Sequence, residues 1–84
     1  MKIDNDVFHA VADEVLSAET KWPKFNSAHE GFAVLNEEVD ELWTHVKTQQ
    51  TKRDIQAMRK EAIQIAAMAI RFVKDVCNEV DGRK

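Results

Sequence analysis

Four glutamates are the residues of this sequence best suited to chemistry. Glu37, Glu38 and Glu41 lie in one apolar-rich stretch, and Glu61 lies in a second. A carboxylate buried without a partner loses several kcal/mol of solvation free energy, so proteins normally supply a cation or a proton beside it. A divalent metal ion is the simplest partner for several carboxylates at once. Because no pair of Cys or His residues accompanies them, an all-oxygen site for Mg²⁺ or Mn²⁺ is favoured over a zinc site.

Helical spacing separates the three glutamates of the first stretch. On a helical wheel with Leu35 at zero, Glu38 falls at about 60°, Glu41 at about 120° and Glu37 at about 160°. Glu38 is therefore expected to border the core and Glu41 to lie beside it one turn later. Glu37 is expected to be more exposed.

Glu61 is the charge least compatible with its surroundings. It falls only about 40° from the apolar position Ile65, while Gln64 falls about 100° away on the same side. If the two stretches form antiparallel neighbouring helices, the glutamates of the first can face Glu61 and Gln64. We therefore expect these side chains to form the metal site.

A solvated or salt-bridged arrangement is the alternative. Glutamates on helix flanks are commonly exposed, and Glu61 can pair with Arg59, with Lys60 or with a cation of a partner chain. His45, one turn beyond Glu41, can be a peripheral ligand but is more simply a surface histidine.

The elements that carry these residues are predicted to be helices. Apolar residues recur at helical spacing over about 6–19, and Asp4 or Asn5 can provide the N-cap. A short connector over 21–26 follows, where Trp22-Pro23 favours an extended backbone.

The second helix is predicted to start with a capping box, Ser27 to Glu30, and to run to about Thr48. Gly31 in its first turn allows close backbone packing. Its apolar residues advance in steps of three and four, which is typical of the seam of a helical bundle. These residues are Phe32, Leu35, Val39, Leu42 and Val46.

A polar turn at Thr48–Thr51 leads to a third helix, predicted from Thr51 or Lys52 to about Val80 and closed by Asp81-Gly82. It would be about 40 Å long, longer than a globule of this size is wide. Apolar residues cover more than half of its circumference, so it is expected to pack on two sides. Three helices of one chain cannot cover both sides.

The predicted fold is therefore one all-α domain over residues 1–84, with three helices per chain. Its four-helix-bundle-like core would be completed in a homodimer or homotetramer, as the small size of the chain also favours. Few glycines and one proline argue against an all-β fold.

Composition argues against two classes of partner. The net charge is −3 and the pI is about 5.5, which does not favour binding to a nucleic-acid polymer. The most apolar window, 62–73, contains Gln64 and Arg71 and is too short to span a bilayer. The N-terminus has no signal-peptide core, so we expect a soluble, cytoplasmic protein. The single Cys77 lies in an apolar stretch and is expected to be a small buried side chain.

Glu37-Glu38-x-x-Glu41, followed after nineteen residues by Glu61-x-x-Gln64, resembles the signature of MazG-like all-α nucleoside triphosphate pyrophosphohydrolases. That signature reads Glu-Glu-x-x-Glu, a variable spacer, and Glu-x-x-Asp. The flanking segments 26–35 and 66–72 are also similar to a small MazG-like subgroup, and the resemblance covers about 22–80.

The resemblance implies Mg²⁺-dependent hydrolysis of a nucleoside triphosphate to a monophosphate and pyrophosphate, with a house-cleaning role in the nucleotide pool. It implies that Glu38, Glu41 and Glu61 are metal ligands and that Glu37 orients or activates water. Gln64 occupies the position of the usual Asp. Its carbonyl oxygen can bind Mg²⁺ but is neutral, so metal affinity should be lower. The alternative is a weak or inactive MazG-like module that binds nucleotide or a protein partner.

Residues for substrate binding are expected around this site. Trp22 and Phe25 can stack on a nucleobase or, alternatively, plug the end of the bundle, whereas Trp43 is expected in the core or an interface. Basic side chains can reach phosphate, and polar groups such as Asp75 lie further along the cleft, where they can meet neighbouring side chains or substrate. The substrate-binding candidates are Trp22, Lys47, Arg71, Lys74 and Asn78.

Overall fold

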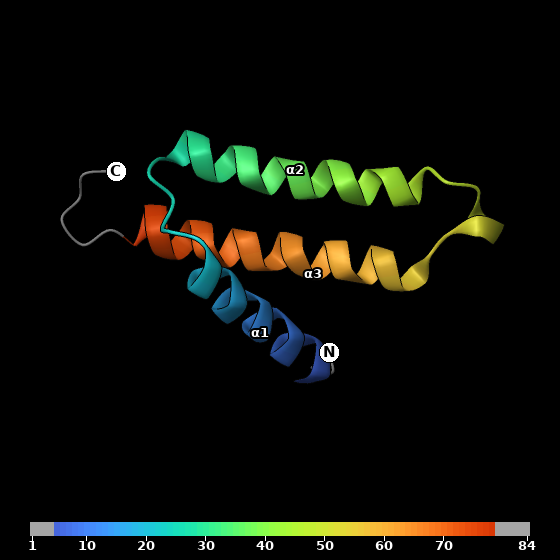
Figure 1. The fold of residues 1–84 in the computed structure, drawn as a ribbon, viewed down its shortest axis with the longest axis horizontal. Coiled ribbons are helices and arrows are strands. Elements are labelled where there is room, and N and C mark those ends of the chain that lie inside the picture. Colours follow the sequence, from blue (N-terminus) through green and yellow to red (C-terminus); the bar gives the residue numbers. More distant parts are fainter. Residues whose placement is uncertain (1–4, 79–84) are drawn as a thin grey trace.

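The computed structural model describes residues 5–78, which form helices and connecting turns and contain no β-strand. This confirms the all-α class and the three helices. The main elements are α1 (Asn5–Lys21), α2 (Ala28–Val46) and α3 (Ile55–Phe72), with a 3₁₀ turn (Gln50–Lys52) before α3 and a π-helical turn (Val73–Cys77) after it (Figure 1). No helix in this range is long and apolar enough to cross a membrane.

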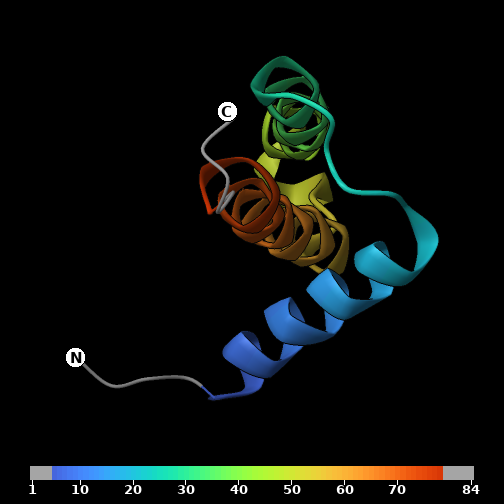
Figure 2. The same cartoon turned by 90° about the vertical axis from the view of Figure 1, so that its left-hand side faces the viewer.

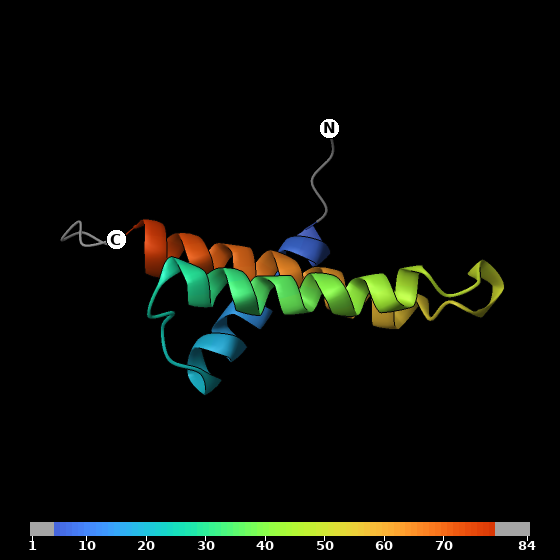
Figure 3. The same ribbon diagram turned by 90° about the horizontal axis from the view of Figure 1, so that it is seen from above.

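The three helices are arranged around α3. α2 and α3 run antiparallel side by side, and α1 crosses α3 obliquely on the side away from α2 (Figures 2 and 3). α3 therefore packs on both of the other helices, whereas α1 and α2 make few contacts with each other. The prediction that α3 packs on two sides is met, in part, within one chain.

The start of α2 agrees with the predicted capping box. Ser27 Oγ accepts a hydrogen bond from the Glu30 backbone N–H at 3.0 Å. The Glu30 carboxylate reaches back one residue further than in the standard motif and accepts from the Asn26 N–H at 2.7 Å. The local sequence thus determines where α2 begins.

The start of α3 was predicted about three residues too early. Asp54 is the N-cap, and its side chain accepts from the Ala57 N–H at 3.0 Å. The residues before it form the 3₁₀ turn instead. Arg53 donates from Nη2 to Val46 O at 2.7 Å and from Nε to Thr48 O at 3.1 Å. It thereby satisfies carbonyl groups at the end of α2.

Gly31 permits the close approach of α2 to its neighbours, as predicted. A Cβ atom at this position would lie 2.7 Å from Phe72 Cδ2 and 3.0 Å from Phe25 Cδ2. The first turn of α2 therefore packs directly against aromatic rings of α3 and of the connector. The buried core continues from there between α1 and α3; its members are Val11, Val15, Ala18, Phe25, Ala67, Met68 and Val76.

Apolar surface remains exposed in the single chain. Among the predicted seam residues of α2, Phe32 is 62% exposed, and Trp43, expected in the core or an interface, is 58% exposed. The Cα radius of gyration is 14.4 Å, compared with about 12 Å for a compact domain of this length. Completion of the bundle by further chains remains a prediction.

The C-terminal turn changes the helical phase. Asn78 N–H donates to Val73 O at 2.8 Å, a bond one residue longer than in an α-helix. Within this turn Asp75 and Val76 are buried, and Cys77 is exposed. The prediction of a buried Cys77 was wrong: its side of the helix is uncovered in the single chain, where Ile70 and Val73 are also exposed, at 42% and 48%. The expected N-cap at Asp4 and the closing Asp81-Gly82 lie outside the described residues.

Candidate metal centre

The structure brings three of the predicted ligands together. One carboxylate oxygen each from Glu38, Glu41 and Glu61 lie within 4.8 Å of one another. α2 supplies the first two at a spacing of three residues, and the antiparallel α3 supplies the third. Oxygens bound to one octahedral Mg²⁺ lie about 3–4 Å apart, so side-chain movements on the order of 1 Å would complete the geometry.

Glu61 is the most deeply placed of the three. It is 8% exposed, and its Oε2 has no hydrogen-bond partner among residues 5–78. An unpaired buried carboxylate oxygen is costly and uncommon in native proteins. The anomaly that the sequence indicated is therefore present in the folded chain.

Neighbouring carboxylates and burial raise the pKa values of Glu38 and Glu61. The pKa of Glu38 rises from 4.5 to about 7, mainly because burial removes solvent and then because Glu41, Glu61 and Glu37 repel its charge. The pKa of Glu61 is raised by its hydrogen-bonding contact with Glu41, by burial and by repulsion from Glu41. A bound cation would favour the ionised form of each group.

His45 is near the cluster and is not a fully exposed surface histidine. It is half-buried, and its interaction with Glu61, like that of Lys60, lowers the pKa of Glu61. These contributions only partly oppose the shift.

Gln64 contacts two of the three carboxylates. With its amide oriented to suit its neighbours, the nitrogen donates to Glu38 Oε2 at 2.7 Å and faces Glu61 Oε1 at 3.3 Å. Rotation of the amide by 180° would present the carbonyl oxygen to the same point. Gln64 can thus hold the carboxylates together by hydrogen bonds or supply a fourth oxygen ligand, but it does not add charge.

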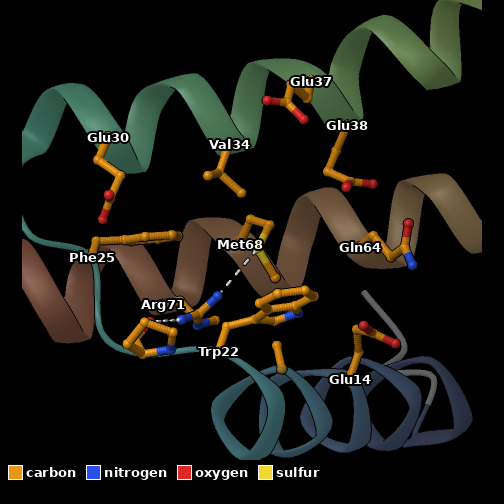
Figure 4. A pocket seen from close by; sticks show the side chains of 12 residues that line it. Glu14, Trp22, Phe25, Glu30, Val34, Glu37, Glu38, Gln64, Met68 and Arg71 are labelled. Atoms are coloured by element: carbon orange, nitrogen blue, oxygen red, sulfur yellow. Dashed lines mark hydrogen bonds between the residues drawn. The ribbon is translucent and has the colours of Figure 1, made fainter.

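A cavity of about 470 Å³ adjoins the cluster. α1 and α2 form facing walls, and α3 runs between them (Figure 4). Its volume is within the range of small-molecule sites, about 300–1,000 Å³. Glu38 and Gln64 belong to both cluster and cavity. The lining residues are Glu14, Ala18, Trp22, Pro23, Phe25, Glu30, Val34, Glu37, Glu38, Gln64, Met68 and Arg71.

Arg71 and Asp75 form a buried unit at the far end of the cavity. Arg71 is 2% exposed, and its Nη2 donates to Pro23 O at 2.8 Å and lies 4.0 Å from Asp75 Oδ2. Its guanidinium lies over the Phe25 ring at 4.5 Å. Asp75 also accepts from the Phe25 N–H at 3.1 Å. Asp75 therefore anchors the connector; the expectation that it meets Lys74, Asn78 or substrate was wrong.

The predicted substrate-binding residues divide into two groups. Trp22, which is 63% exposed, and Arg71 line the cavity, and Glu37, the predicted water-activating residue, lines it as well. The other three do not line it. Lys47 is the C-cap of α2, Lys74 pairs with Glu19 at 2.6 Å, and Asn78 caps the π-helical turn.

Sequence reasoning missed the contribution of α1 to this cavity. Glu14 and Ala18, one helical turn apart, form its wall. Their spacing was visible, but no pattern in the sequence indicated that α1 would face the site across α3.

In comparisons with protein-family models, with curated proteins and with solved structures, no match was found. The MazG-like resemblance therefore rests on the motif and its flanking segments.

Proposed function

We propose that this protein is a Mg²⁺-dependent nucleoside triphosphate pyrophosphohydrolase of MazG-like type. The observation that carries the proposal is the convergence of Glu38, Glu41 and Glu61 within 4.8 Å beside a cavity of nucleotide size. The products would be a nucleoside monophosphate and pyrophosphate, which suits a role in clearing non-standard or excess nucleotides.

The residues present fit a hard divalent cation. All the donors are oxygens when the Gln64 amide presents its carbonyl, and Glu61 Oε2 lacks a partner among residues 5–78. Mg²⁺ prefers such ligands and retains several waters; Mn²⁺ accepts the same donors. When bound, the metal would neutralise phosphate charge and lower the pKa of a coordinated water.

The protein's own groups would then have distinct roles. Glu38, Glu41, Glu61 and Gln64 hold the cation, and Glu38 also borders the cavity that takes the substrate. Glu37, which is exposed and lines the cavity, would orient the attacking water and accept its proton. The exposed apolar residues of α2 and α3 support assembly into a homodimer or homotetramer.

One observation favours a second candidate, a catalytically weak or inactive nucleotide-binding module. The Gln64 amide can hydrogen-bond to Glu38 and Glu61 without a metal. It also leaves the site one negative charge short of the family pattern, which weakens cation binding.

Pyrophosphate release from a panel of ribo- and deoxyribonucleoside triphosphates, with Mg²⁺ or Mn²⁺, tests the two candidates. We expect turnover that requires metal and is abolished by Glu38→Gln. Asp40→Asn, an exposed acid on the same helix outside the cluster, is the matched control and should retain activity. Absence of pyrophosphate with every nucleotide and both metals would reject the enzyme and leave the binding module.

A further inference from the structure

The cavity has two chemically different ends. Glu37, Glu38 and Gln64 lie at one end, and Arg71 with Phe25 lies at the other (Figure 4). Gln64 and Arg71 are seven residues apart on α3, which places them about 10 Å apart along the helix axis. This separation is comparable with that between the α-phosphate and the outer edge of the base in a nucleotide.

Arg71 is the only basic residue among those that line the cavity, but its charge is already compensated. Asp75 Oδ2 lies 4.0 Å away, both side chains are almost fully buried, and Glu30 also lines this end. A phosphate placed here would meet the field of these carboxylates. The sequence-based expectation that Arg71 binds phosphate is therefore less favourable than binding to a neutral acceptor.

The guanidinium retains hydrogen-bonding capacity. Nη2 uses one N–H on Pro23 O, Nη1 has only a weak contact with Met68 Sδ at 3.7 Å, and Nε has no partner among residues 5–78. An arginine has five N–H donors and no acceptor. A ligand group that satisfies it must therefore be an acceptor.

The rest of this end suits a flat aromatic ligand. Trp22 and Met68 lie between the two ends of the cavity, and Phe25 and Pro23 line the Arg71 end (Figure 4). Aromatic and apolar side chains stack on any base without discriminating among them. Selection at this end therefore falls to the donors of Arg71.

We propose that Arg71 reads the edge of a nucleobase, so that the site prefers bases with an exocyclic carbonyl oxygen to bases with an amino group at the same position. Hypoxanthine or guanine would be preferred to adenine, and uracil to cytosine. A guanidinium N–H pairs with a carbonyl oxygen, or with O6 and N7 together, but opposes an amino donor. This inference rests on the proposed function in one respect: it assumes that the base belongs to a nucleotide whose phosphates lie at the glutamate end of the cavity.

Binding of nucleosides without phosphate and without metal tests the proposal directly. The matched pairs are inosine against adenosine and uridine against cytidine, titrated to millimolar concentrations and followed by the Trp22 indole N–H resonance in NMR spectra. We expect the carbonyl member of each pair to bind about tenfold more tightly or better. Equal affinities, the opposite preference, or no binding by any of the four would overturn the proposal.

Removal of the guanidinium supplies the second measurement. Arg71→Met combined with Asp75→Asn removes both charges and keeps an acceptor for the Phe25 N–H. It should bring the inosine-to-adenosine ratio close to one. Arg59→Met, an exposed arginine of α3 outside this cavity, should leave the ratio unchanged. An unchanged ratio in the folded double variant would contradict the assignment; if that variant does not fold, the wild-type ratios decide.

Failure of this inference and failure of the proposed function give different results. Hydrolysis of ATP and ITP with equal kcat/KM would retain the enzyme and reject the role of Arg71. Carbonyl-selective nucleoside binding without hydrolysis of any triphosphate would retain the role of Arg71 and reject the enzyme.

Discussion

Replacement of Glu38 by Gln is expected to stabilise the metal-free protein at high pH. Burial and neighbouring carboxylates raise the pKa of Glu38 from 4.5 to about 7. The folded state therefore holds this proton to higher pH than the unfolded state does. Below about pH 4.5 both states are protonated and the group carries no penalty; stability falls between about pH 4.5 and 7, where only the unfolded carboxyl is ionised, and the loss is complete once pH has risen through about 7.

The magnitude follows from the same shift. A change in pKa from 4.5 to about 7 corresponds at full effect to about 3 kcal/mol. Solvent screening of a half-buried side chain reduces this to about 1–2 kcal/mol. A domain of this size shifts its melting temperature by about 4–8 °C per kcal/mol. At about pH 8 the Gln variant should therefore melt about 5–15 °C above the wild type, and at about pH 4 the two should nearly coincide.

Thermal unfolding followed by circular dichroism, at fixed protein concentration and with a metal chelator, measures the difference. Excess Mg²⁺ or Mn²⁺ should raise the melting temperature of the wild type more than that of the variant, because Glu38 is a proposed ligand. Asp40→Asn, which removes an exposed charge of the same helix outside the cluster, is the control. A Glu38→Gln protein less stable than wild type at high pH without metal would refute the electrostatic reasoning.

Three further substitutions test other contacts. Gln64→Asp adds a fourth carboxylate to the cluster, so it should lower the stability of the metal-free protein at neutral pH. It should also increase Mg²⁺ affinity, measured by calorimetric titration, and turnover, measured by pyrophosphate release. Unchanged metal affinity would count against Gln64 as a ligand position. Gly31→Ala places a Cβ 2.7 Å from Phe72 Cδ2, and this overpacking should lower the free energy of unfolding by about 1–3 kcal/mol. The higher helix propensity of alanine offsets about 1 kcal/mol of this loss. A more stable variant in urea unfolding would show that the Phe rings move aside to accommodate the methyl group. Asp54→Ala removes the N-cap bond to Ala57 and should cost about 1 kcal/mol in the same assay, with no loss expected if another residue takes over the cap.

Local signals predicted much of the fold. The Ser27 capping box determined the start of α2, and helical spacing placed Glu38 and Glu41 beside Glu61 because the intervening turn makes the helices antiparallel. Asp54 was an equally good N-cap signal, but it lies among charged residues that also fit a continuous helix. Its misreading moved the start of α3.

Contacts between residues far apart in the sequence could not be predicted from local residue spacing. The contacts of Arg71 with Pro23 and Phe25 join residues nearly fifty positions apart, and no pattern in the sequence specifies them. No pattern in the sequence indicated the π-helical turn over Val73–Cys77, nor that the side of the helix carrying Cys77 would be uncovered in the single chain.

The position of α3 between two helices that scarcely meet has a consequence for ligand binding. α1 and α2 each pack on α3 and make few contacts with each other, while residues of both helices line the cavity. A ligand in the cavity would contact Ala18 of α1 and Val34 of α2 at the same time. Binding would then link α1 and α2, which make few direct contacts, so the free energy of ligand binding would add to the stability of the fold.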